Sequence, residues 1–137
     1  MDIQTVGEAF VSFLATQTST TFGIDIFMGE LPLDAPDEAW LVLVSGGNPE
    51  VVTADGAMIK LYTFNIYRRS LAGKEIERDL FSLEETLNRA DCVNLDGFET
   101  IYSRATNFAQ DIDLENENRR IGLLQAQVRL FKETQIS

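Results

Sequence analysis

The chain has 137 residues, of which 45% are hydrophobic, and its 22 acidic and 11 basic residues give a formal net charge of −11. This length fits one domain, residues 1–137, that buries roughly two-thirds of its unfolded surface and folds without disulfides. Nucleic-acid phosphates and anionic membranes repel so acidic a chain, and the composition therefore disfavours nonspecific binding to either. The absence of histidine removes the usual general base and the commonest metal ligand.

The sequence contains a single cysteine, Cys92, which excludes a disulfide within the chain and suits a reducing compartment. Because no histidine is available to activate its thiol, we expect Cys92 to be chemically inert. The first residues lack a basic segment followed by a long apolar run, and no stretch approaches about 20 apolar residues. We therefore expect neither a signal peptide nor a membrane span.

Hydrophobic periodicity predicts a helix over residues 2–17, since apolar side chains recur there at steps of three and four. The polar run at 16–21 ends it, because such residues favour caps and turns over helix interiors. Alternation then predicts a short strand over 23–28. Two prolines within 29–36 interrupt this strand and indicate an irregular loop.

Two apolar segments then predict the middle of a sheet. Residues 39–44 form a short apolar run that favours a buried strand, ended by Gly46, Gly47 and Pro49, with a loop over 50–57. Residues 58–69 are rich in β-branched and aromatic residues and lack proline and glycine, as a pleated surface favours. We expect the second strand to lie well inside the sheet, with its apolar end covered on both faces.

The rest of the chain predicts a helix and two further strands. From residue 72 to 89 the apolar period becomes 3.6, with a stripe that must lie on the sheet: Ile76, Leu80, Leu83 and Leu87. A turn over 94–97, a strand over 98–105, an acidic loop over 110–118 and a final strand over 119–132 follow. The predicted class is α+β, with a mixed, mainly antiparallel sheet and the order α-β-β-β-α-β-β.

The acidic run at 111–117 raises the question of a metal site. Carboxylates at alternate positions begin an EF-hand loop, but the sixth position is Asn116 instead of glycine and the twelfth is Gly122 instead of glutamate. A solvated hairpin loop is the favoured interpretation. The Gly46-Gly47 pair lacks both a following lysine and a helix, so it indicates a turn instead of a phosphate cradle.

Two arginine pairs, Arg68-Arg69 and Arg119-Arg120, stand out in an acidic chain. They either form ion pairs with neighbouring carboxylates or contact another molecule, since arginine is enriched at interfaces. Trp40 lies in an apolar run and is expected in the core. No pattern predicts a catalytic residue, a cofactor or a metal ligand, so residue chemistry alone gives an acidic α+β domain.

Taken together, the elements resemble a known family. The segment Ala39-Trp-Leu-Val-Leu-Val-Ser-Gly-Gly-Asn-Pro49, the central strand, the amphipathic helix, the acidic loop and the last strand follow one another as in the tail terminator (minor capsid, or tail completion) proteins of long-tailed bacteriophages. The resemblance covers nearly the whole chain. Its most specific part is the stretch from the tryptophan to the glycine pair. A related role, head completion, stays open.

The resemblance implies a non-enzymatic structural protein of the virion, located at the head–tail junction and assembled in the host cytoplasm. It implies a ring, usually a homohexamer, that caps the tail tube, stops tube polymerisation and joins the head connector. Its partners are then further copies of itself, the tube protein and the connector protein. DNA passes only in transit, and no membrane or cofactor takes part.

In such a ring we expect acidic side chains to face the channel, because carboxylates do not hold the passing phosphates. The arginine pairs are expected at contacts with other subunits or with the tail. The candidate channel-facing residues are Glu50, Asp55, Asp111, Asp113, Glu115 and Glu117. The candidate interface residues are Arg68, Arg69, Arg119 and Arg120.

Two other classes remain as alternatives to a virion protein. One is an acidic α+β binding module, such as an inhibitor or nucleic-acid mimic, whose charge clusters on one face against a basic partner. The other is a hydrolase that uses carboxylates and a metal, which metal-dependent turnover would reveal.

Overall fold

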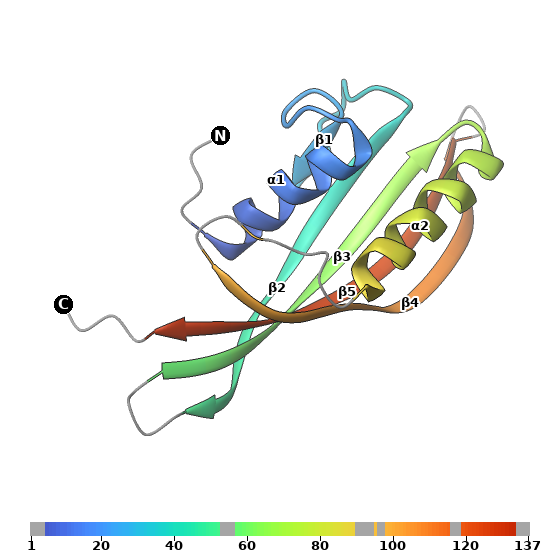
Figure 1. The fold of residues 1–137 in the computed structure, drawn as a ribbon. Helices are drawn as coiled ribbons and strands as arrows, with labels where there is room; N and C mark the ends of the chain where they lie inside the picture. Colours follow the sequence, from blue (N-terminus) through green and yellow to red (C-terminus); the bar gives the residue numbers. More distant parts are fainter. Residues whose placement is uncertain (1–4, 53–56, 90–94, 96–97, 116–118, 134–137) are drawn as a thin grey trace.

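The computed structural model describes residues 5–52, 57–89, 95, 98–115 and 119–133. The element order confirms both the predicted α+β class and the predicted order α-β-β-β-α-β-β (Figure 1). The elements are α1 (Val6–Thr18), β1 (Ile26–Met28), β2 (Ala39–Val52), β3 (Ala57–Ser70), α2 (Gly73–Asn88), β4 (Glu99–Glu115) and β5 (Arg119–Glu133). Cys92 and most of the predicted turn over 94–97 lie outside the described residues.

One five-stranded sheet has the strand order β1-β2-β3-β5-β4. β1 pairs parallel with β2, whereas the other three pairings are antiparallel, which gives the predicted mixed sheet. β3 is the central strand, as its composition predicted. It pairs with β2 on one side and with β5 on the other along most of its length.

Helix α1 begins at a capping box. The Thr5 hydroxyl accepts a hydrogen bond from the Glu8 backbone N–H at 3.1 Å, and the Glu8 carboxylate accepts one from the Thr5 N–H at 3.0 Å. The helix ends at Thr18, and Ser19 caps it with a left-handed backbone (φ 57°). The predicted start at residue 2 lies outside the described residues. The predicted end at 17 agrees within one residue.

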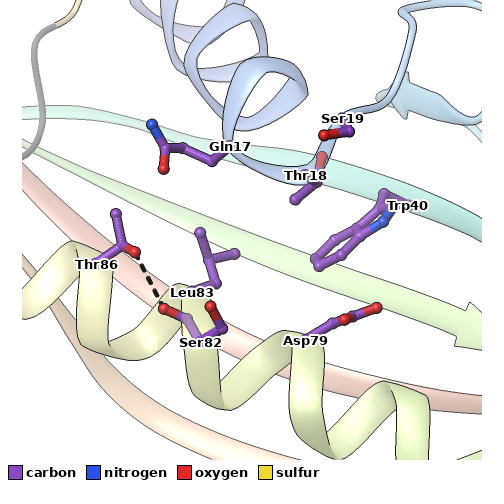
Figure 2. A pocket seen from close by; sticks show the side chains of 8 residues that line it. All are labelled: Gln17, Thr18, Ser19, Trp40, Asp79, Ser82, Leu83 and Thr86. Atoms are coloured by element: carbon purple, nitrogen blue, oxygen red, sulfur yellow. Dashed lines mark hydrogen bonds between the residues drawn. The ribbon is translucent and has the colours of Figure 1, made fainter.

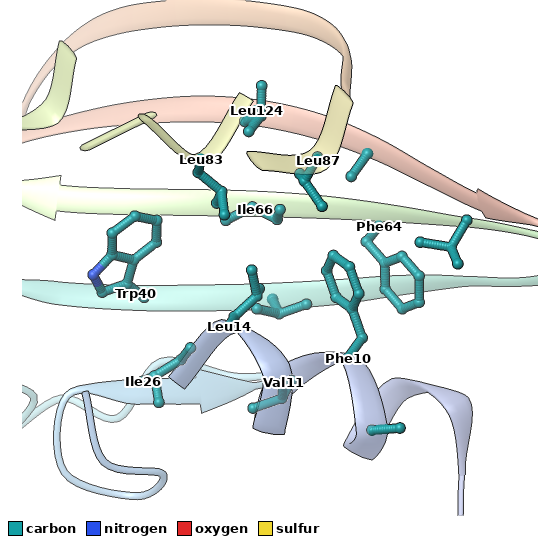
Figure 3. Packing of buried hydrophobic residues seen from close by; sticks show 14 of the residues in the cluster. Phe10, Val11, Leu14, Ile26, Trp40, Phe64, Ile66, Leu83, Leu87 and Leu124 are labelled. Carbon is teal, nitrogen blue, oxygen red and sulfur yellow. The ribbon is translucent and has the colours of Figure 1, made fainter. Parts of the chain in front are cut away.

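Both helices pack on the same face of the sheet, and the core lies between the two layers (Figures 1 and 3). The rings of Phe10 in α1 and Phe64 in β3 stack with their centroids 3.9 Å apart. The predicted α2 stripe is confirmed as core, and alternate residues of β5 meet it. The buried residues facing the helices from β3 and β5 are Phe64, Ile66, Leu124, Ala126, Val128 and Leu130.

Gly122 lets α2 approach β5 closely. A Cβ built on Gly122 would overlap Ile76 Cγ2 and would lie 2.7 Å from Leu80 Cδ1, both in α2. Beyond this contact, the Ser103 hydroxyl of β4 donates to the Leu87 carbonyl at 2.8 Å. These contacts fix the helix across β5 and β4, at the side of the sheet away from α1.

Two predicted strand ends are wrong, and both strands are longer than expected. β2 continues to Val52 instead of ending at 44, with pairing irregularities between Ser45 and Asn48 and between Pro49 and Val51. Strand β1 pairs only as far as Val42, so among the described residues β2 is an edge strand beyond it, where bulges accommodate glycine and proline. The glycine pair is therefore part of an irregular strand and not the turn that the sequence predicted.

The predicted acidic loop over 110–118 is also wrong in part, because β4 runs to Glu115. Irregularities after Thr100, Ala105 and Asp111 each interrupt its register with β5. Every such shift changes which side chains share a face, so the residues lose the simple alternation by which a strand is predicted. Conversely, the first strand is shorter than the predicted 23–28, because Gly23 has a left-handed backbone (φ 85°) in a turn.

Candidate interaction surfaces

Arg68 lies near the end of β3 on the face covered by the helices, and only 5% of it is exposed. Its guanidinium bridges two carboxylates, Glu38 at 3.0 Å and Asp79 of α2 at 3.1 Å. Its central carbon lies 5.3 Å from the centroid of the Trp40 ring. Arg68 therefore joins the start of β2, β3 and α2 within the chain, and Trp40 is buried as predicted.

Arg69 and Ser70 fasten the connection that precedes β2. The Arg69 guanidinium donates to the carbonyls of Ala35 at 3.1 Å and Pro36 at 2.7 Å. The Ser70 hydroxyl donates to Glu38 at 2.9 Å and accepts the Ala72 N–H at 3.0 Å. Two alternatives were predicted for the first arginine pair, and Arg68 forms the first of them, ion pairs within the chain. A contact with another molecule stays a prediction.

The second arginine pair begins β5. Arg120 is half-buried and lies opposite Ser70 of β3, and Arg119 lies opposite Glu115 of β4. Because the end of β3 pairs with the start of β5, the two arginine pairs lie at the same end of the sheet. The pairs are far apart in the chain, so the sequence could not show this proximity; the β3–β5 register alone brings them together.

The predicted channel-facing residues are spread over two strands. Glu50 belongs to β2, and Asp111, Asp113 and Glu115 belong to β4 instead of a loop. Their backbone places them at opposite sides of the sheet, since β2 and β4 are separated by β3 and β5. Asp55 and Glu117 lie outside the described residues. Whether any of these side chains faces a channel stays a prediction.

A polar cleft of about 180 Å³ lies between the end of α1 and the middle of α2 (Figure 2). Two of its hydroxyl groups already bond within their own helices: Thr86 donates to the Ser82 carbonyl at 3.1 Å and Thr18 to the Leu14 carbonyl at 2.7 Å. Its carboxylate, Asp79, pairs with Arg68. Within the described residues, no group of three or more acidic or cysteine side chains is placed to hold a metal ion.

The second face of the sheet has no helix on it among the described residues, so the predicted cover on both faces is wrong for this part of the chain (Figure 1). We call this surface the open face. An apolar hollow of about 130 Å³ lies at one end of it, bordered by the connection before β2. The residues lining the hollow include Leu31, Leu41, Leu43, Tyr67, Arg69 and Ile121. The sequence signal for this face was the apolar pair Ile59 and Leu61, which is only half-buried.

Several large apolar side chains are exposed in the connections on either side of β1. Leu33 is fully exposed, and Ile24 and Phe22 are 64% and 43% exposed. Single exposed apolar residues are ordinary, but these three all belong to the two connections that flank β1. We call residues 19–25 and 29–38 together the β1 connections. From the sequence alone, residues 16–21 were predicted as a polar run, 23–28 as a strand and 29–36 as an irregular loop, so no contact surface was predicted there.

Charge is divided unevenly along the chain. Nine of the 22 acidic residues and none of the 11 basic residues precede Lys60, so residues 1–59 carry −9 of the formal −11. These residues include α1, β1 and β2, and the two strands lie together at one side of the sheet. Every basic residue therefore belongs to β3, α2, β4, β5 or the segments between them. The described part of the β1–β2 side is acidic, whereas the other side of the domain carries charges of both signs.

These observations define a two-layer α+β domain with two helices on one face of a mixed sheet. No family model matches the chain, and the comparison with curated proteins gives no match. Among solved structures, the chain is similar to a chain of the "Virion of native gene transfer agent (GTA) particle". The two share 14% identity with a TM-score of 0.56, over 86% of this chain and 84% of that chain. In the described residues, no helix is long and apolar enough to cross a membrane.

Proposed function

We propose that this protein is a non-enzymatic structural component of a phage-like virion and that it caps the tail tube as a ring. The observation that carries the proposal is the likeness of fold to a virion chain over most of both chains. The family resemblance in the sequence points the same way. It adds the finer role of tail termination, with head completion as the nearest alternative.

The proposed mechanism is recognition. One face of the ring makes the contacts that a further tube ring would make, while the other face presents a surface for the head connector. A head-to-tail interface between identical subunits closes into a ring when its rotation divides a full turn, and a homohexamer is the expected closure. The tube protein, the connector and further copies of the chain are the proposed partners, at the head–tail junction.

We propose that acidic side chains line the channel of this ring and let DNA pass without binding. Acidic side chains along the channel would not hold the phosphates, because no counterions are released to favour binding. The candidates remain Glu50, Asp55, Asp111, Asp113, Glu115 and Glu117. Replacing the four acidic residues between 111 and 117 by lysine should leave assembly largely intact and impair DNA delivery. Normal infection by this variant would contradict the channel assignment.

The test of the ring is the mass of the assembly, measured by light scattering with and without purified tail tubes, with electron microscopy of the tube ends. We expect weak self-association alone and rings on tube ends. Moderate salt should favour the ring, because it screens repulsion between acidic subunits over about 10 Å at 0.1 M. Tubes that are already capped serve as the control. A chain that stays monomeric at every salt concentration and on open tubes would refute the proposal.

One observation favours a second candidate, an acidic module that occupies a basic partner. The absence of any basic residue before Lys60 would give such a module one side that carries acidic residues and no basic ones. It would remain monomeric, ignore tail tubes and bind a basic protein in a salt-sensitive, one-to-one complex. Light scattering with a basic test protein therefore separates the two candidates.

A further inference from the structure

The open face differs in charge from the rest of the chain. Its three central strand segments, 41–45, 59–69 and 121–129, contain no carboxylate in a protein with 22 acidic residues. Arg104 of β4 is exposed beside this region, and its guanidinium donates to Gln127 of β5 at 3.1 and 3.2 Å. The apolar hollow lies on the same face. This surface therefore combines an apolar depression with the exposed guanidinium of Arg104 and has no acidic residue in its central strand segments.

The β1 connections have the complementary character. They contain exposed Leu33, Ile24 and Phe22 together with the exposed carboxylates Glu30 and Asp34, and they contain no basic residue. Because Leu33 is fully exposed, its side chain is not packed against its own subunit. Exposed apolar side chains accompanied by charges of one sign suit an interface in which apolar groups exclude water and charges steer association.

We propose that the β1 connections of one copy dock on the open face of a second copy. The second copy is the occupant because the chain itself carries both halves of a matched pair. Its exposed apolar side chains match the hollow, and its exposed carboxylates Glu30 and Asp34 match the exposed Arg104. The two patches differ, so the contact is head to tail, which is the kind that closes into a ring. This inference rests on the proposed ring and names the surfaces that build it.

Disulfide trapping tests the contact directly. In a Cys92→Ser background, one tagged copy carries Leu33→Cys and an untagged copy carries Leu43→Cys or Leu123→Cys on the open face. A disulfide requires Cα atoms within about 7 Å, so two positions are used. The matched control pairs Leu33→Cys with Phe81→Cys, at a position that is 58% exposed on α2. Mixed copies are oxidised on open tail tubes, and mixed dimers are measured on non-reducing gels.

We expect at least about tenfold more mixed dimer with an open-face cysteine than with Phe81→Cys. Equal yields, or dimers formed mainly between two Leu33→Cys copies, would overturn the proposed contact. If rings still form on tubes in that case, only this inference fails and the proposed function stands. If the unmodified chain forms no ring on tubes, the proposed function fails, and this inference fails with it.

Charge reversal gives a second, independent readout. Glu30→Lys with Asp34→Lys changes the β1 connections, whereas Glu77→Lys with Glu85→Lys makes the same change of charge at exposed positions on α2. We expect the first variant to weaken self-association at least about tenfold and the second to leave it unchanged or stronger. Equal effects would show that net charge alone governs assembly and would overturn the docking. Thermal unfolding confirms that both variants are folded.

Discussion

Replacing Gly122 by alanine should destabilise the protein, although the same change at a compatible position is often favourable. Gly→Ala at such a position stabilises by about 0.4–1 kcal/mol, because it restricts the unfolded chain. At Gly122 the new methyl group would overlap Ile76 Cγ2 and would lie 2.7 Å from Leu80 Cδ1. Overpacking of this kind costs about 1–3 kcal/mol. The sign of the change in unfolding free energy therefore shows whether α2 packs this closely on β5.

The assay is equilibrium unfolding in urea, followed by the fluorescence of Trp40, which is the single tryptophan and is buried. Stability is compared at constant m-value, since a changed slope would signal a changed denatured or native state. We expect Gly122→Ala to lower the free energy of unfolding by about 1–3 kcal/mol.

A double-mutant cycle with Ile76→Ala tests the cause. Truncating Ile76 removes Cγ2, so the alanine at 122 should cost less in that background than in the unmodified protein. The coupling should be at least about 0.5 kcal/mol, as is usual for residues in contact. If Gly122→Ala is neutral or stabilising, or if the two changes simply add, the close packing of α2 on β5 is refuted.

Three further predictions concern the core, the ion pairs and the acidic run. Leu83→Ala should lower the unfolding free energy by about 2–5 kcal/mol, because Leu83 is buried. Phe81 is exposed, and Phe81→Ala should change the unfolding free energy by less than about 0.5 kcal/mol. Similar losses at both positions would contradict the described orientation of α2. Arg68→Ala should lower the free energy of unfolding in urea by about 1.5–3 kcal/mol, because the hydrogen bonds of Arg68 to two carboxylates are lost. A change near zero would show that these ion pairs do not stabilise the fold. Millimolar calcium should not raise the melting temperature; a rise abolished by Asp111→Asn with Asp113→Asn would establish a metal site.

Regular local patterns made much of the fold predictable from the sequence. The α2 stripe repeats every three or four residues, and it packs as core because one helical face must be buried. β3 has strand composition along most of its length and lies at the centre of the sheet. In both cases the residues that decide the structure are neighbours in sequence, so their spacing carries the information.

Pairing between distant segments decided the rest. β2 and β4 extend beyond their predicted ends because β3 and β5 supply hydrogen-bonding partners across bulges that disturb the alternation. The arginine pairs, separated in the chain, meet only through the β3–β5 register. The open face likewise exists because both helices pack on the same side of the sheet. The spacing of residues within each helix does not specify which side that is. The sequence alone determined which elements form, their order and the net charge, whereas the tertiary structure decided which faces stay uncovered, because that depends on contacts between residues far apart in the chain.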